Sequence, residues 1–142
     1  MSGNFYLETS AILRALLEDD EAALAGITSG VLVTSALTSI ELERALLRAC
    51  FDKCITTDQR RAKRAWFRDL LEVCEVINLD DAVRERAGQP FPVEPIRTLD
   101  AVHLASALLF EQALGAPLTL LSVDNRVRDN AQELGFRVLP DL

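Results

Sequence analysis

Residues 4–17 read NFYLETSAILRALL, and they set a pattern that the rest of the chain repeats. A short run with strand character, Asn4–Leu7, leads directly to an acid, Glu8, and then to a helical stretch, Ser10–Leu17. Four more runs predict strands, at Val31–Thr34, Val73–Leu79, Leu118–Val123 and Arg137–Leu139. These runs are mostly continuous in apolar residues, which is typical of a sheet buried on both faces.

Helical patterns occupy the segments between the predicted strands. After Ser10–Leu17 we expect a short helix to about Ile27, and then helices at Ser39–Phe51, Thr57–Leu71, Asp80–Ala87, Leu99–Leu114 and Asn125–Leu134. The Pro-rich segment 90–95 cannot be helix interior and is expected to be a loop. Strands that alternate with such helices predict right-handed crossovers and a parallel sheet of about five strands, an α/β fold. With 142 residues, the chain (1–142) is expected to form a single domain.

Composition and charge exclude several classes of protein. The chain is 49% hydrophobic and 26% charged, which is typical of a globular domain, and its net charge is −7. An acidic chain of this kind does not favour binding duplex nucleic acid by bulk charge. We find no run of 18 apolar residues and no signal-peptide pattern, so no membrane partner is expected. The small, odd number of cysteines (three) argues against a disulfide framework and favours a cytoplasmic location.

Four acids lie where strands pass into helices. Glu8 follows the first strand, Glu41 and Asp100 lie in the first turns of helices, and Asp124 ends the fourth strand. Ligands of parallel sheets bind outside the carboxyl ends of the strands, so these acids are expected to face one crevice. Each has a structural alternative: a capping box at 38–41 for Glu41, the helix dipole for Asp100, an N-cap for Asp124 and a hydrated strand end for Glu8.

Taken together, the four acids require a cation. Two like charges ~4 Å apart at an effective dielectric near 20 repel by about 4 kcal/mol. Arg44, Arg97 and Arg126 are the available counter-charges, but a hard metal ion is the more economical solution. Ligation by oxygen alone favours Mg²⁺ or Mn²⁺ over zinc, and a two-metal site of this kind clamps the attacking and leaving oxygens of a phosphodiester.

Four motifs resemble those of PIN domains, with the closest likeness to VapC toxins of toxin–antitoxin pairs. They are YLETSA (6–11), TSIELERA (38–45), TLDAVHLASA (98–107) and LSVDNR (121–126), and they span nearly the whole chain in the family's order. The resemblance implies a three-layer α/β/α sandwich and a metal-dependent endoribonuclease. It also implies a homodimer and a groove between helices, near residues 66–71, that receives the C-terminal segment of an antitoxin.

The resemblance carries over to individual residues. Glu41, Asp100 and Asp124 match metal-site acids of the family, and Ser10 matches a hydroxyl that supports the first acid. Glu8 is a departure, because the family normally has Asp there; a longer side chain suits the octahedral geometry of Mg²⁺ less well. The expected site therefore has Asp100 and Glu41 as main metal ligands, with Asp124 and Glu8 completing it or holding a second ion.

Further residues are expected to act on the substrate or on the ligands. Ser10 and Ser122 would orient ligands or water, and Arg44, Arg48 and Arg126 would contact RNA phosphates. The alternative to a nuclease is a weakened PIN-fold module that binds RNA or protein, because of Glu8. A receiver-like phospho-acceptor domain is disfavoured, because no lysine follows Lys63.

Three other groups of residues have both a functional and a structural interpretation. The basic segment that begins at Lys53 is either a surface that follows phosphates or a solvated helix face; its other members are Arg60, Arg61, Lys63, Arg64 and Arg68. Cys50, Cys54 and Cys74 could form a zinc site with His103, but small buried thiols are favoured. His103 itself is interpreted as packed or hydrogen-bonded rather than as a general base.

Overall fold

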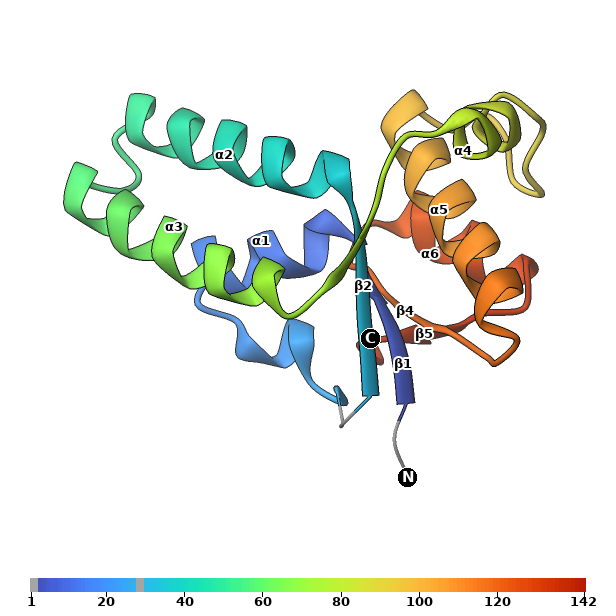
Figure 1. The fold of residues 1–142 in the computed structure, drawn as a ribbon. Coiled ribbons are helices and arrows are strands. Elements are labelled where there is room, and N and C mark those ends of the chain that lie inside the picture. The colour runs from blue at the N-terminus through green and yellow to red at the C-terminus, as the bar shows by residue number, and fades with distance from the viewer. Residues whose placement is uncertain (1–2, 28–29) are drawn as a thin grey trace.

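The computed structural model describes residues 3–27 and 30–142. The secondary structure follows the order that the sequence predicts, with helices between parallel strands (Figure 1). The elements are β1 (Gly3–Leu7), α1 (Thr9–Leu17), the 3₁₀ helix η1 (Glu21–Leu24), β2 (Gly30–Ser35), α2 (Ala36–Phe51), α3 (Thr57–Glu72), β3 (Glu75–Ile77), α4 (Asp81–Ala87), α5 (Thr98–Leu114), β4 (Thr119–Leu121), α6 (Asn125–Glu133) and β5 (Arg137–Leu139).

Five described strands form one parallel sheet in the order β3-β2-β1-β4-β5. Helices α1, α2 and α3 cover one face of the sheet, and α4, α5 and α6 cover the other (Figure 1). This arrangement confirms the expected three-layer α/β/α sandwich. The chain leaves β1 for β2 in one direction and returns to the other side of β1 at β4. The order therefore reverses between β1 and β4, the place where ligands of such sheets bind.

The core has two halves, one on each face of the sheet. Along β1, Phe5 and Leu7 pack with α1, α2 and α3, whereas Tyr6 packs with α5 and α6. Successive side chains of a strand point to opposite faces, so a strand covered on both sides needs apolar residues at every position. This explains the continuous apolar run in the sequence.

Several element boundaries differ from the expected ones. Strand β4, for example, covers only Thr119–Leu121 of the expected Leu118–Val123. Helix α2 begins at Ala36, because the Ser35 hydroxyl accepts a hydrogen bond from the Leu37 N–H at 3.1 Å. The second short helix is a single 3₁₀ segment that ends at Leu24. Strand β3 is shorter than predicted, because Val73 closes α3 and its N–H donates to the Leu70 carbonyl.

Within residues 3–27 and 30–142, no helix has both the length and the apolar composition needed to cross a membrane. Helix α5 ends as the sequence predicts, at Gly115, whose φ of 69° is the left-handed conformation that closes many helices.

Candidate active site

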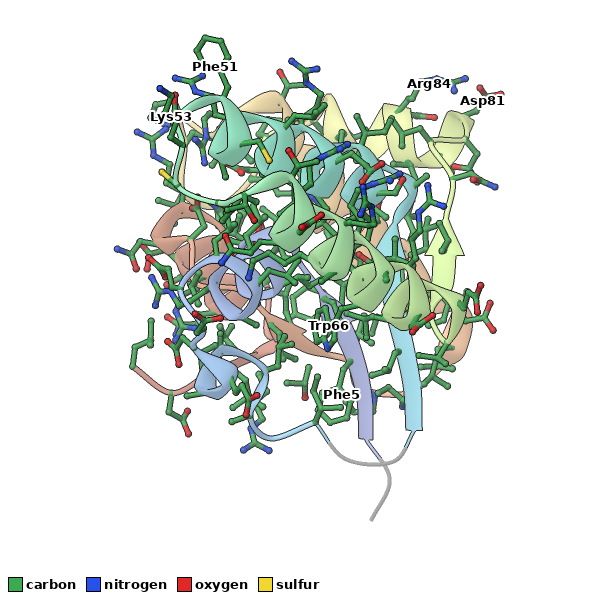
Figure 2. The ribbon with its side chains drawn as sticks, turned by 90° about the vertical axis from the view of Figure 1, so that its left-hand side faces the viewer. Phe5, Phe51, Lys53, Trp66, Asp81 and Arg84 are labelled. Carbon is green, nitrogen blue, oxygen red and sulfur yellow. The ribbon has the colours of Figure 1, made fainter. Side chains whose placement is uncertain are left out.

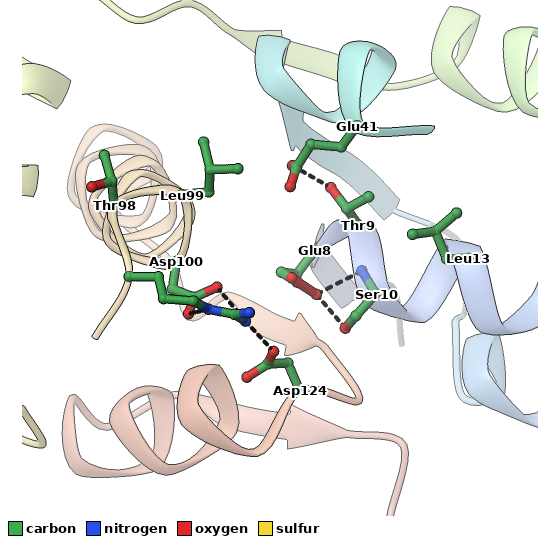
Figure 3. Close-up of a pocket in the computed structure, with 10 residues that line it drawn as sticks. Glu8, Thr9, Ser10, Leu13, Glu41, Thr98, Leu99, Asp100 and Asp124 are labelled. Atoms are coloured by element: carbon green, nitrogen blue, oxygen red, sulfur yellow. Dashed lines mark hydrogen bonds and ion pairs between the residues drawn. The ribbon is translucent and has the colours of Figure 1, made fainter. Parts of the chain in front are cut away.

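The four predicted acids line one pocket at the carboxyl edge of the sheet (Figure 3). The pocket has a volume of about 310 Å³ and lies where the strand order reverses. Glu8 and Asp124 follow β1 and β4, Glu41 comes from α2, and Asp100 comes from the first turn of α5. The fold thus brings together side chains that are far apart in sequence, because the carboxyl ends of its parallel strands meet at one edge of the sheet.

Glu8 is buried, with only 5% of its surface exposed, so the expectation of a hydrated strand end is wrong. One carboxylate oxygen, Oε2, accepts hydrogen bonds from the Ser10 N–H at 2.8 Å, the Ser10 hydroxyl and the Ser122 hydroxyl at 3.2 Å. Burial raises the pKa of Glu8, and the nearby His103 and the two hydrogen bonds from Ser10 only partly offset this effect. Glu8 therefore faces the pocket as a carboxyl group that ionises less readily than an exposed one.

Ser10 and Ser122 tie the first and fourth strand ends together. The Ser10 hydroxyl accepts from the Val123 N–H at 3.0 Å, and the Ser122 hydroxyl accepts from the Asp124 N–H at 3.1 Å. The two hydroxyl oxygens are 3.2 Å apart. The serines therefore hold Glu8 and position the backbone that carries Asp124.

Glu41 is held by residues from α1 and α5. Its Oε1 accepts from the Thr9 hydroxyl at 2.8 Å and is 2.7 Å from Nε2 of His103. Burial alone would raise the pKa of Glu41, but His103 and Thr9 outweigh it, so this pKa is lowered. Glu41 is thus kept ionised at the edge of the pocket.

The capping-box alternative for Glu41 is wrong, because α2 starts before Thr38 and Glu41 lies in its second turn. The Thr38 hydroxyl is instead buried and lies 2.7 Å from the Thr34 hydroxyl.

His103 holds Glu41 in position, and the residues that it contacts could not be named from the sequence. It is 1% exposed, and its Nδ1 lies 2.8 Å from the Tyr6 hydroxyl, which is fully buried. Burial raises the pKa of Tyr6 well above its usual value, so the phenol stays protonated and its O–H can donate a hydrogen bond to Nδ1. In the neutral ring, Nε2 then carries the hydrogen that faces Glu41. The packed, hydrogen-bonded interpretation of His103 is confirmed.

Asp100 and Asp124 share one arginine. Nε of Arg97 donates to Oδ2 of Asp100 at 3.0 Å, and Nη2 of Arg97 donates to Oδ2 of Asp124 at 2.8 Å (Figure 3). The ion pair with Asp100 is the main reason why the pKa of Arg97 is raised. Asp124 also caps α6, since its Oδ1 accepts from the Arg126 and Val127 N–H groups. The N-cap interpretation of Asp124 is therefore confirmed alongside its place in the pocket.

The donor set fits a hard divalent cation. Four carboxylates supply only oxygen, the ligand type that Mg²⁺ and Mn²⁺ prefer. A guanidinium cation already lies between two of them, which shows that positive charge is stable there. As the side chains stand, no three acids, cysteines or histidines within the described ranges are arranged around a single metal position.

The predicted phosphate-contacting arginines lie outside the pocket. Arg44 and Arg48 line a separate hollow on the outer face of α2, together with Phe51. Arg126 is exposed in the first turn of α6. Among the residues that the structure describes, neither Arg44 nor Arg126 forms an ion pair with the four acids.

Acidic neighbours neutralise part of the basic segment. Arg64 binds Glu43 through two hydrogen bonds of 2.7 and 2.9 Å, and Arg61 pairs with Asp58. Lys53 lies beyond the end of α2, beside Phe51 and away from the strand ends (Figure 2). The segment is thus mostly a paired or solvated helix face.

The zinc alternative is not supported by the geometry. Cys50 lies in α2, but this helix ends at Phe51, so Cys54 does not share its face. Cys54 is exposed, while Cys50 and Cys74 are half-buried, so the expectation of buried thiols is wrong for Cys54. Burial raises the pKa of Cys74 to about 11, which keeps it a thiol.

A second hollow, of about 440 Å³, lies between α1, η1 and α3. Its walls are largely apolar and include Leu16, Leu24 and Trp66. Trp66 is 45% exposed and extends from α3 into this hollow (Figure 2). Phe67, its neighbour in sequence, is the residue of this segment that fills the core.

Comparisons with known proteins agree with this geometry. Ribonuclease VapC46 from Mycobacterium tuberculosis (strain ATCC 25618 / H37Rv) is 37% identical over 138 residues, which cover 94% of this chain and 95% of the relative. Ribonuclease VapC35 from the same strain is 35% identical over 142 residues, with 94% of each chain covered.

The crystal structure of VapBC2 from Rickettsia felis bound to a DNA fragment from their promoter matches the fold with a TM-score of 0.60. The identity is 13%, and the match covers 95% of this chain and 96% of the other. The model of the family described as PIN domain matches residues 5–133. With its sheet order, its four acids and relatives named VapC ribonucleases, the chain belongs to the PIN domain family.

Proposed function

We propose that the protein is a divalent-metal-dependent endoribonuclease that acts as a VapC-like toxin. The observation that carries this proposal is the single pocket at the β1–β4 crevice into which four strand or helix ends bring carboxylates. Relatives named as VapC ribonucleases, 30–37% identical over nearly the whole chain, support the same activity.

Asp100 and Glu41 would be the main ligands of Mg²⁺ or Mn²⁺. Asp100 is anchored on the first turn of α5, and Glu41 is kept ionised by His103 and Thr9. Asp124 and Glu8 would complete the coordination or hold a second ion. When bound, the ion lowers the pKa of a water molecule and offsets the negative charge of the phosphodiester.

The remaining residues of the site would orient the metal ligands or contact the RNA substrate. Ser10 and Ser122 keep the Glu8 carboxyl aimed at the pocket through their hydroxyls. Arg44, Arg48 and Arg126 would hold RNA phosphates at a distance from the reacting bond. Because Arg48 also pairs with the exposed Asp52, it would exchange that weak contact for a phosphate.

The decisive experiment compares the wild-type protein with Asp100→Asn on a panel of single-stranded RNAs, with Mn²⁺, with Mg²⁺ or with EDTA. Asparagine keeps the shape of the side chain but loses the charge. We expect metal-dependent cleavage by the wild type and none by the variant. Asp81→Asn is the matched control, because Asp81 is exposed in α4 and pairs only with Arg84 in the described part of the chain. Full cleavage by Asp100→Asn would refute the metal assignment.

A second candidate function is an RNA- or protein-binding module with little catalytic activity. The observation that favours it is Glu8, a buried carboxyl with a raised pKa whose Oε2 binds two serines. Glu8→Asp distinguishes the two, because aspartate is shorter by one methylene. A silent wild type that gains cleavage in Glu8→Asp would support the weakened module; a cleaving wild type would refute it.

We also propose a cognate antitoxin as partner and the cytoplasm as location. The apolar hollow beside Trp66 supports the antitoxin as a docking partner, since the resemblance places an antitoxin segment between helices of this layer. Three free cysteines are consistent with a reducing compartment. A homodimer follows from the resemblance alone, and light scattering of the purified protein tests it.

A further inference from the structure

Arg97 uses the carboxylate oxygens of Asp100 and Asp124 that a metal ion would need. It donates to both oxygens of Asp100, through Nε at 3.0 Å and Nη2 at 3.4 Å. Oδ1 of Asp124 is occupied by the backbone N–H groups of α6, and Arg97 takes the other oxygen at 2.8 Å. In this conformation neither acid offers the pocket an oxygen that is not already hydrogen-bonded.

Only the arginine is free to move away. Its side chain is 62% exposed, whereas that of Asp100 is 7% exposed. Arg97 precedes the first residue of α5 and makes no capping hydrogen bond with its side chain. Asp124 is fixed by its capping role. An exchange of cations at this point therefore requires only rotation of the Arg97 side chain toward solvent.

We propose that Arg97 is a built-in competitor of the metal ion: its guanidinium holds Asp100 and Asp124 in the metal-free protein and leaves when a divalent ion binds. The inference rests on the proposed function, because it concerns the same metal site. It explains how these acids coexist without an ion, and it makes Arg97 the residue that sets the metal affinity. Arg97 acts through the acids and is therefore a positioning residue.

The test is a Mn²⁺ titration of the metal-free protein by calorimetry, for the wild type, Arg97→Gln and Arg126→Gln. Both variants remove one positive charge that is close in sequence to a site acid, but only the first removes the guanidinium that contacts the carboxylates. We expect Arg97→Gln to bind Mn²⁺ about tenfold more tightly, which corresponds to about 1.4 kcal/mol. Arg126→Gln is expected to stay within about threefold of the wild type, because exposed charges are screened.

A second readout uses thermal unfolding with EDTA or with Mn²⁺. With EDTA, Arg97→Gln should melt below the wild type, because Asp100 loses its partner. With saturating Mn²⁺ the two melting temperatures should converge. Arg97→Lys, which keeps the charge but not the planar fork, should fall between the two in affinity.

Each result separates this inference from the proposed function. Equal Mn²⁺ affinities for Arg97→Gln and Arg126→Gln, or weaker binding by Arg97→Gln, would overturn the competition while leaving the metal site in place. Absence of Mn²⁺ binding by all three folded proteins would overturn both.

Discussion

Tyr6→Phe removes a single oxygen atom from the buried support of the active site. The hydroxyl lies 2.8 Å from Nδ1 of His103, and the two rings meet edge to face with centroids 5.9 Å apart. Phenylalanine keeps the ring contact and the volume, so no cavity forms. The variant therefore isolates the hydrogen bond that fixes the histidine facing Glu41.

The expected loss of stability follows from burial. His103 is 1% exposed, so the abandoned Nδ1 cannot recruit solvent in place of the hydroxyl. Leaving a buried polar atom without its partner costs about 1–3 kcal/mol. Urea denaturation followed by circular dichroism at pH 7 should show a lower midpoint with an unchanged slope. In a protein of this size, each kcal/mol corresponds to a melting temperature lower by about 2–4 °C.

The pH dependence adds a second signature, because the freed histidine no longer presents its Nε2 hydrogen to Glu41 at all times. The lowered pKa of Glu41 stabilises the fold above the ordinary value of 4.5 and stops doing so as pH falls through the folded-state value. The deficit of Tyr6→Phe should therefore be larger at pH 6 than at pH 3.5.

His103→Leu, alone and combined with Tyr6→Phe, completes a double-mutant cycle with an expected coupling of about 0.5–3 kcal/mol. A Tyr6→Phe protein within 0.5 kcal/mol of the wild type, with no coupling in the cycle, would refute this account of the support.

Two more predictions concern packing and the unusual first acid. Phe67→Ala should lose about 3–5 kcal/mol of unfolding free energy, because Phe67 is 1% exposed, and Trp66→Ala should lose less than half as much; equal losses in urea denaturation would contradict the assigned core. Glu8→Gln should gain stability relative to the wild type as pH rises from 5 to 7 in EDTA. Because the pKa of Glu8 is raised, the folded protein keeps the Glu8 proton to a higher pH than the unfolded chain does. The unfolding free energy of the wild type therefore falls as pH rises above 4.5, by at most about 1.4 kcal/mol per pH unit. A difference that stays constant across parallel denaturation series at these pH values would show that Glu8 does not titrate differently in the fold.

The covered sheet, the alternation of strands and helices and the gathering of the acids could be predicted from the sequence, because they depend on local patterns and on one general rule. Continuous apolar runs require a sheet covered on both faces, and parallel strands bring their carboxyl ends to one edge. Glu8 and Asp124 directly follow two such runs, so their proximity could be predicted without knowing which strands pair.

Other features depended on choices that local patterns leave open. Ser35 and the Thr38–Ser39 pair are both good N-caps, and only the extension of β2 to Ser35 decides between them. The sequence named three candidate arginines as counter-charges. The spacing of Arg97 and Asp100, three residues apart at a helix start, was the available signal for the right one. Tyr6 in β1 contacts His103 in α5, and no local pattern in the sequence indicates a contact between residues so far apart.

The position of β1 between β2 and β4 also has a consequence for protein synthesis. The ribosome releases Glu8 well before the neighbouring strand β4 and its following acid Asp124, because β2, β3 and the helices up to α5 lie between them in the chain. At about 5–20 residues per second, roughly several seconds or more of synthesis separate the two walls of the pocket. A nascent or prematurely terminated chain that stops before Leu118 therefore lacks β4, which pairs with β1, and also lacks Asp124, one of the four acids of the pocket. The cleft therefore forms only after β4 has been synthesised, long after the first of its acids.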